Sequence, residues 1–369
     1  MVKNLVFVVG TRPNFVKAAP LWHEASDKDW CRPILVHTGQ HYDASLSSKL
    51  WRDLELPDPS EDLGVGPGDQ SWQLGEIQRR LMATLPRLKP DGVIVFGDVN
   101  STLAAAQAAR SLELPLAHVE AGLRSFDSRM VEEKNRIAVD AISDLLFTTE
   151  PKAIENLRLE GISMNRVHAV GNLMVDCLRN LLPRAQQLQK RLHDRYGLKL
   201  NGYAILTIHR AENVDDINGL RQFMETISEI ASELPIVFPA HPRTVKRLTN
   251  AWYGNRPSGL ILTEPLPYLD FLALVSASRV VLTDSGGIQE ETSVLGIPCL
   301  TLRENTERPI TLLRGTNQLI GFDGDKARAA LERLLVSQPP AGPRVLSPVP
   351  DEWDGRAASR IMQVLKYAW

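Results

Sequence analysis

The fold of this chain is decided by the stretch Val280-Val281-Leu282-Thr283-Asp284-Ser285-Gly286-Gly287-Ile288-Gln289-Glu290-Glu291. It begins as a short apolar run rich in β-branched side chains, and a hydroxyl residue and two glycines then lead into a helical sequence. The stretch therefore predicts a strand, a tight turn and a helix. The backbone N–H groups of such a turn are unobstructed, and the positive end of the helix dipole favours a phosphate there. The alternative is a structural Gly-Gly turn with Ser285 as the helix N-cap.

Glu291 lies in the next turn of this predicted helix. An ionised carboxylate only accepts hydrogen bonds, so Glu291 could receive two hydroxyl groups of a ribose. A strand, a diphosphate site and a ribose acceptor follow one another in the order expected of a nucleotide site.

Working outward, short apolar runs alternate with helical patterns along both halves of the chain. Five predicted strands lie in the first half, at residues 5–9, 33–37, 92–96, 116–119 and 145–148. Six more lie in the second half, at residues 203–207, 236–239, 260–263, 280–283, 298–302 and 318–321. This βαβα alternation predicts two doubly wound parallel sheets. We place the first domain at residues 1–171, the second at 172–353 and a last helix at 354–369.

Composition limits the class of protein. A chain of 369 residues suits two domains, and its formal net charge of -2 gives no electrostatic reason to expect nucleic acid or a membrane surface as partner. Cys31, Cys177 and Cys299 are widely separated among apolar residues, which predicts reduced, buried thiols and a cytoplasmic location. No His or Cys spacing predicts a metal site. The first apolar run is too short to span a bilayer.

Carboxylates follow two of the predicted strands in the first half. Asp98 comes directly after residues 92–96, and Glu120 after residues 116–119. Ligands bind beyond the carboxyl ends of the strands in such sheets, and two carboxylates in one cleft push their pKa values apart, which supplies an acid and a base. The alternative for Asp98 is a helix cap. Glu132 and Glu133 form a further acidic pair, for which a salt-bridged helix start is the alternative.

Basic side chains follow strands of the second half. His209 and Arg210 come after residues 203–207, and His241 follows the next strand. A contact with phosphate or a proton-transfer role is the interpretation we favour for His209. Arg308 follows the strand after the Gly-Gly turn and would face the diphosphate.

Several motifs occur in the order seen in one family of enzymes. They are Gly10-Thr11-Arg12-Pro13, residues 37–43, Gly97-Asp98, residues 118–125, Glu132-Glu133-Lys134-Asn135-Arg136, residues 207–210, residues 284–291 and Thr306-Glu307-Arg308-Pro309. Over essentially its whole length the chain resembles the non-hydrolysing UDP-N-acetylglucosamine 2-epimerases. The resemblance implies a GT-B-like fold, with two Rossmann-like domains facing a cleft and the last helix returning to the first domain. It also implies a cytoplasmic homodimer that uses no cofactor, neither metal nor nicotinamide.

The resemblance implies a reaction and its residues. UDP is eliminated from UDP-N-acetylglucosamine (UDP-GlcNAc) to leave a glycal, and is added back to give UDP-N-acetylmannosamine (UDP-ManNAc). The implied catalytic residues are Asp98, Glu120, Glu132 and His209. The implied substrate-binding residues are Arg12, Lys17, Arg136, Arg210, His241, Tyr268, Phe271, Ser285, Gly286, Gly287, Glu291 and Arg308. Tyr268 and Phe271 would pack against uracil, or else belong to the core.

The chain departs from the family pattern at two places. Val131 stands where many members have Pro, and Tyr42-Asp43 stands where members regulated by a second UDP-GlcNAc often have Arg. The alternatives that stay open are an epimerase of a related UDP-acetamido sugar, such as a diacetamido uronic acid, and a GT-B glycosyltransferase. Arg308-Pro309 favours plain UDP-GlcNAc, and the carboxylates of the first half argue against a glycosyltransferase.

Overall fold

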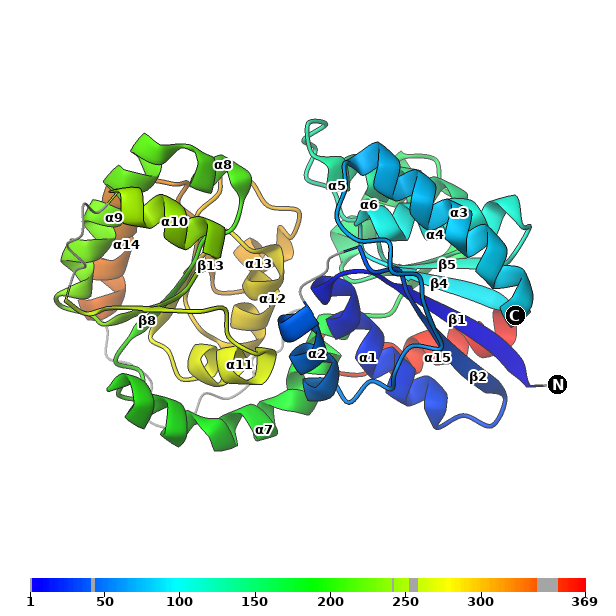
Figure 1. Cartoon of the computed structure of the whole chain (residues 1–369), viewed down its shortest axis with the longest axis horizontal. Coiled ribbons are helices and arrows are strands. Elements are labelled where there is room, and N and C mark those ends of the chain that lie inside the picture. Colours follow the sequence, from blue (N-terminus) through cyan, green and yellow to red (C-terminus); the bar gives the residue numbers. More distant parts are fainter. Residues whose placement is uncertain (1, 41–43, 241, 252–257, 337–350) are drawn as a thin grey trace. The chain divides into compact units, whose positions relative to one another are not determined.

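The computed structural model describes residues 2–40, 44–240, 242–251, 258–336 and 351–369. The chain divides into two compact units, which we call unit 1 (Met1–Arg179 with Pro350–Trp369) and unit 2 (Asn180–Val349). Each unit is built on one parallel sheet with helices on both faces (Figure 1). The predicted class, two parallel-sheet α/β domains, is confirmed.

Unit 1 holds a sheet with strand order β3-β2-β1-β4-β5-β6-β7. The strands are β1 (Lys3–Val9), β2 (Cys31–His37), β3 (Glu61–Asp62), β4 (Gly92–Phe96), β5 (Leu116–Ala121), β6 (Leu145–Thr148) and β7 (Val167–Ala169). The helices are α1 (Arg12–Ser26), α2 (Ala44–Asp53), α3 (Gln70–Leu88), α4 (Asn100–Ser111), α5 (Val131–Ile142), α6 (Pro151–Leu159), a short 3-10 turn (Met164–Arg166), the start of α7 (Leu173–Tyr196) and α15 (Ala357–Ala368). Helices α3 and α4 cover one face of the sheet, and α1 and α15 cover the other (Figure 1). Strand segments covered on both faces are apolar, which is why residues 5–9 of β1 and the whole of β4 are unbroken apolar runs.

Unit 2 holds a sheet with strand order β10-β9-β8-β11-β12-β13. The strands are β8 (Ala204–Thr207), β9 (Ile236–Pro239), β10 (Leu260–Thr263), β11 (Val280–Thr283), β12 (Cys299–Thr301) and β13 (Asn317–Leu319). The helices are α8 (Ala211–Asp215), α9 (Ile217–Ala231), α10 (Pro242–Ala251), α11 (Tyr268–Ser276), α12 (Gly286–Leu295), α13 (Ile310–Leu313) and α14 (Gly324–Val336). Helices α9, α10 and α14 lie on one face, and α11 and α12 on the other (Figure 1). β11 lies between β8 and β12, so the turn after β11 has the ends of two neighbouring strands beside it.

The last helix, α15, belongs to unit 1. It packs against α1, and the Asp176 carboxylate on α7 accepts hydrogen bonds from the N–H groups of Ala357 (3.2 Å) and Ala358 (2.8 Å) at its start. Burial raises the pKa of Asp176 to about 6, although these hydrogen bonds oppose the rise. The indole of Trp353, just before α15, is fully buried and donates to the Thr149 carbonyl (2.8 Å). A side-chain cap and a buried anchor therefore fix the chain end to unit 1.

The three cysteines are buried and none forms a disulfide. The prediction of buried thiols is therefore confirmed. Within the described residues, none of the helices is long and apolar enough to cross a membrane.

Candidate active site

The end of strand β5 has a strained backbone. The register between β5 and β6 shifts between Val119 and Ala121, and Glu120, the residue between them, has φ = 72°. Side chains rarely adopt this left-handed conformation, which costs on the order of 1–3 kcal/mol and is found most often at functional sites. The bulge turns the Glu120 carboxylate to the carboxyl end of the sheet, where it is buried. The strained backbone therefore supports the prediction that Glu120 is a functional residue.

Glu120 has a cation as its neighbour. Lys17 Nζ, on α1, lies 2.6 Å from Glu120 Oε2, and both side chains are buried. Gly97 sits beside this pair with φ = 64°, and a Cβ atom there would come within 3.0 Å of Lys17 Nζ. The glycine therefore leaves room for a buried Lys–Glu pair at the end of β4.

Asn14 holds α1 in place for this contact. Its side-chain amide donates to the Phe96 carbonyl at the end of β4 (2.8 Å). Its oxygen accepts from the N–H groups of Gly10 (3.1 Å) and Thr11 (3.2 Å). Asn14 therefore ties the turn after β1 to β4, one turn of helix before Lys17. No sequence pattern indicates this role of Asn14.

Asp98 pairs with a different cation. Arg136 of α5 lies 2.5 Å from Asp98 Oδ2 and 2.5 Å from Glu133 Oε2, and its guanidinium is buried. The Asp98 carboxylate keeps 21% of its side-chain surface exposed. The N-cap of α4 is Val99, so the interpretation of Asp98 as that helix cap is wrong. The Asp98 carboxylate is thus held beside a buried guanidinium while part of its surface stays accessible to another molecule.

The two glutamates at the start of α5 differ in their surroundings. Glu133 is buried and accepts hydrogen bonds from the N–H groups of Ser125 (2.9 Å) and Phe126 (3.0 Å). Glu132 is exposed on the surface of unit 1. The alternative interpretation of this pair was a salt-bridged helix start. That interpretation applies to Glu133, which pairs with Arg136. A catalytic role for Glu132 stays a prediction.

Behind these groups lies a buried histidine that sequence reasoning missed. The ring of His118 on β5 is fully buried, with Nδ1 2.7 Å from Asp140 Oδ1 and Nε2 2.7 Å from the Gly97 carbonyl oxygen. Both neighbours are acceptors, so making both hydrogen bonds requires the doubly protonated imidazolium. Asp140 also pairs with Arg124 (2.7 Å). Burial would raise the pKa of Asp140, but the hydrogen bonds and charges of His118 and Arg124 hold it below its ordinary value.

This network fixes the turn that carries Asp98. His118 holds the carbonyl of the preceding residue, and Asp140 also accepts from the N–H of Gly122, two residues after Glu120. One ion pair thus supports both candidate carboxylates from behind. A histidine inside an apolar strand run was the signal that could have found it.

In unit 2 the organising residue is Asp284, at the end of β11. Its fully buried carboxylate accepts hydrogen bonds from the N–H groups of His209 (3.0 Å) and Arg210 (2.9 Å) and from the Asn213 amide (3.1 Å). It also lies 2.6 Å from Nδ1 of His209, whose side chain stays 58% exposed. Burial would raise the pKa of Asp284, but the hydrogen bond and charge of the His209 ring, together with the N–H groups of Arg210 and His209, lower it. The carboxylate therefore orients the His209 ring and favours a proton on Nδ1.

The turn after β11 forms the predicted helix start. Ser285 is the N-cap of α12 and makes no side-chain capping bond, so its hydroxyl is not used as a cap. A Cβ atom on Gly286 would come within 2.5 Å of Arg308 Nη1 and 2.9 Å of Glu307 Oε1. Arg308, itself buried, also lies 2.9 Å from Glu290. Gly286 therefore allows a guanidinium to reach the positive end of α12, an arrangement suited to a doubly charged anion.

Glu291 faces α11. Its buried carboxylate accepts a hydrogen bond from the Tyr268 hydroxyl (2.7 Å). Phe271 is half-buried on the same helix. Packing of Tyr268 and Phe271 against uracil remains a prediction, as does the ribose contact of Glu291.

The remaining predicted substrate-binding residues have mixed surroundings. Arg12 and Arg210 are half-buried at the starts of α1 and α8, and Gly287 lies in the first turn of α12. His241 and the Tyr42-Asp43 departure lie outside the described residues.

The family of the chain follows from its similarity to known proteins. The model of the UDP-N-acetylglucosamine 2-epimerase family matches residues 23–366. The chain belongs to this family. The resemblance inferred from the motifs, and with it the prediction of an epimerase, is confirmed.

Individual members of the epimerase family cover nearly the whole chain. A UDP-N-acetylglucosamine 2-epimerase of Methanocaldococcus jannaschii is 38% identical over 378 residues, which cover 99% of each protein. A structure of the Methanocaldococcus jannaschii UDP-GlcNAc 2-epimerase in complex with UDP-GlcNAc and UDP superposes with a TM-score of 0.87 at 37% identity, covering 99% of each chain. A UDP-2,3-diacetamido-2,3-dideoxy-D-glucuronate 2-epimerase of Pseudomonas aeruginosa is 37% identical over 343 residues, or 90% of this chain and 93% of that protein.

The surroundings of Glu291 in this epimerase-family chain lead to a test of stability. Burial raises the pKa of Glu291 from 4.5 to about 7, the nearby Glu290 charge adds to the rise and the Tyr268 hydrogen bond opposes it. The folded protein therefore binds this proton more tightly than the unfolded chain, and stability falls as pH rises from about 4.5 to about 7. Glu291→Gln is expected to raise the free energy of unfolding by about 1–3 kcal/mol at pH 8 and by much less at pH 5.

Urea unfolding of both proteins at the two pH values measures this difference. A gain of equal size at both pH values would show that the Glu291 charge is not its cause.

Proposed function

We propose that the chain interconverts UDP-GlcNAc and UDP-ManNAc by eliminating UDP and adding it back. The observation that carries the proposal is the division of chemistry between the units. Unit 1 holds two carboxylates beside buried cations, Glu120 with Lys17 and Asp98 with Arg136. Unit 2 holds the glycine-lined helix start with Arg308. Membership of the epimerase family supports joining these two features into one reaction.

The reaction needs a base and an acid at C2 of the sugar. When the base removes the C2 proton, the C–H electron pair forms the C1–C2 double bond, and the C1–O electron pair leaves with UDP. The product pair is 2-acetamidoglucal and UDP. Return of UDP to C1 and of a proton to the opposite face of C2 gives the epimer. Because the two faces are protonated separately, two proton-handling groups are required.

The roles follow from the surroundings of each group. Asp98 is held by Arg136 and keeps part of its carboxylate exposed, which suits a base that substrate can reach. Glu120, held against the ammonium of Lys17, is proposed to handle the proton on the opposite face of C2. Glu132 is proposed as the third carboxylate. His209, held by Asp284, is proposed to stabilise the charge that develops on the departing diphosphate.

Nucleotide binding is assigned to unit 2. The N–H groups at the start of α12 and the Arg308 guanidinium would receive the diphosphate, and Glu291 the ribose hydroxyls. Arg210 and His241 are proposed to join them. Arg12, Lys17 and Arg136 are the proposed substrate contacts from unit 1.

Solvent exchange tests the mechanism. Purified protein incubated with UDP-GlcNAc in D2O is expected to produce UDP-ManNAc, with deuterium at C2 of both sugars after many turnovers. The reason is that an abstracted proton exchanges with solvent before the opposite face is protonated. Proton NMR of the C2 position measures the result. Full retention of protium at C2, or a requirement for a nicotinamide, would exclude this route.

One specific comparison supports a second candidate substrate. The Pseudomonas aeruginosa relative, which acts on a diacetamido glucuronate nucleotide, is about as similar to this chain as the UDP-GlcNAc epimerases are. The two sugars differ at C3 and C6, so kcat/KM measured with each nucleotide distinguishes them. We expect higher kcat/KM with UDP-GlcNAc, because Arg308-Pro309 favours that substrate.

We further propose that the protein works as a homodimer in the cytoplasm and needs no metal. A sedimentation measurement tests the oligomeric state. Activity measured in the presence of a chelator tests the need for a metal.

A further inference from the structure

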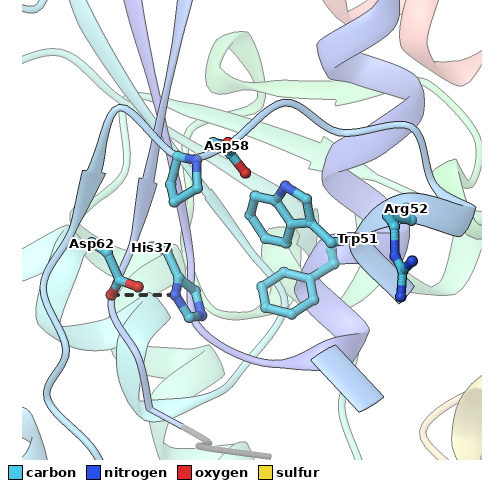
Figure 2. A pocket seen from close by; sticks show the side chains of 7 residues that line it. His37, Trp51, Arg52, Asp58 and Asp62 are labelled. Carbon is cyan, nitrogen blue, oxygen red and sulfur yellow. Dashed lines mark ion pairs between the residues drawn. The ribbon is translucent and has the colours of Figure 1, made fainter. Parts of the chain in front are cut away.

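Unit 1 contains a pocket that the proposed reaction does not use. Its volume is about 420 Å³, within the range of small-molecule sites. Phe15 of α1, His37 at the end of β2 and Trp51 of α2 contribute aromatic rings, and Asp58, Pro59 and Asp62 contribute the segment before and within β3 (Figure 2). None of these residues belongs to the proposed catalytic or substrate-binding set.

Three rings form one corner of this pocket. The Phe15 and Trp51 ring centres lie 5.0 Å apart at 78°, and the Phe15 and His37 centres 5.4 Å apart at 57°. His37 and Trp51 complete the triangle at 5.9 Å and 65°. The rings are inclined to one another rather than stacked flat, so the corner is concave. Figure 2 shows the His37 and Trp51 rings next to each other, with Asp62 on the other side of His37.

The rings are held from behind. The Trp51 indole donates a 2.6 Å hydrogen bond to the Pro57 carbonyl, which fixes the ring against the loop that carries Asp58. Phe15 is almost wholly buried. The corner is therefore a preformed feature of unit 1, and a ligand would not have to order it on binding.

Two carboxylates, Asp58 and Asp62, bring negative charge to this pocket, and they differ in their hydrogen-bond and ion-pair partners. Asp62 lies 3.4 Å from His37 Nδ1 and accepts a hydrogen bond from the Gly64 N–H (2.9 Å), so it already has partners. Asp58 is exposed at the rim, and in the described part of the chain its side chain forms neither a hydrogen bond nor an ion pair. Arg52 also lines the pocket, but it already has an interaction of its own, and in Figure 2 Trp51 stands between it and His37.

We propose that this pocket binds a small organic cation, a protonated amine carried on an aromatic or other apolar body. Ring faces attract cations, and an aromatic corner beside an unengaged carboxylate is the arrangement that desolvates and retains an ammonium group. The apolar body fills the space between the rings and Pro59, and the ammonium lies beside Asp58. A neutral ligand would lose the charge interaction, and an anionic one would meet two carboxylates.

Three probes of equal size separate these contributions. Benzylammonium, benzyl alcohol and benzoate share one ring and differ in charge. Benzylammonium is expected to bind with a Kd on the order of 1 mM, ordinary for a ligand with so few atoms. Benzyl alcohol should bind about tenfold more weakly, and benzoate not measurably. Isothermal titration gives the affinities, and the indole N–H signal that disappears in Trp51→Phe reports on the site by NMR.

Two variants and one control test the residues. Asp58→Asn should bring the affinity for benzylammonium down to that for benzyl alcohol, while Trp51→Ala should weaken both about equally. Asp29→Asn removes an exposed carboxylate from another loop of the same unit and should change neither. UDP binding measured on every variant verifies that the fold is intact.

The inference stands apart from the proposed function, because its probes contain no nucleotide. It is overturned if the three probes bind alike, if none binds at about 10 mM, or if Asp58→Asn leaves the preference for the cation unchanged. If the wild-type protein had no epimerase activity, the proposed cation site would be unaffected.

Discussion

Asp98→Asn is expected to lower kcat by about 10² to 10⁴, the usual contribution of a general base, while the affinity for UDP stays within about twofold of wild type. Asn keeps the shape of the side chain and one oxygen that can accept from Arg136, but it cannot take a proton from C2. The groups proposed to bind UDP belong mainly to unit 2. The effect therefore concerns kcat and not nucleotide affinity.

The control is Asp144→Asn. Asp144 also pairs with an arginine of unit 1, Arg110 (2.9 Å), but it lies at the start of β6, away from the carboxyl ends of the strands. Its variant should keep wild-type kcat. Steady-state kinetics and UDP titration of both variants measure the outcome, and deuterium incorporation at C2 should fall in parallel with kcat for Asp98→Asn. If Asp98→Asn kept the wild-type kcat, Asp98 would not be the base and would only position Arg136.

The sequence predicts the sheets well because their signals are local. Runs such as residues 5–9 and 92–96 are apolar on both faces, a composition that buried parallel strands require. Polar residues directly after such runs must lie at the carboxyl edge of the sheet, so Asp98 and Glu120 could be selected without coordinates. The helix α2 and the short strands β3 and β7 were not predicted, since such elements depend on neighbours distant in the sequence.

The pairing of the site residues could not be predicted. Lys17 and Arg136 were expected among the substrate contacts, and in the structure each pairs with a carboxylate, Glu120 and Asp98 respectively. These contacts depend on how helices pack on the sheet, and no periodicity encodes them. Likewise, only a bulge that shifts the register by one residue gives Glu120 its left-handed backbone.

In unit 2 the sequence pattern indicated the exposed His209 but not the buried Asp284, which orients it. His209 was selected because a histidine followed by an arginine after a strand is conspicuous. Asp284 reads as the last polar residue before a turn, yet four hydrogen-bonding groups converge on it. A buried carboxylate has to be fully satisfied, and only the fold shows by which groups.

The same reasoning makes His118 the most consequential residue behind the site. His118→Leu is expected to lower the free energy of unfolding by about 3 kcal/mol, because it leaves the buried charge of Asp140 with one cation fewer and the Gly97 carbonyl without its donor. The loss lies at the lower end for a broken buried pair because Arg124 still neutralises Asp140. Activity should fall at least about tenfold in kcat at similar KM, since Asp98 and Glu120 lose their common support.

Two further variants separate charge from packing. Adding Asp140→Asn to His118→Leu removes the stranded charge, so the double variant should lose less stability than the two single losses added together. His193→Leu serves as the matched control, because the half-buried ring of His193 contacts only the neutral Tyr203 hydroxyl (3.2 Å) among its described polar neighbours, and its removal should cost about 1 kcal/mol. Urea unfolding gives the free energies, and ¹⁵N NMR of the ring nitrogens tests the imidazolium directly. Strictly additive losses together with a neutral His118 ring would show that the histidine contributes packing alone, and the positions of Asp98 and Glu120 would then need another explanation.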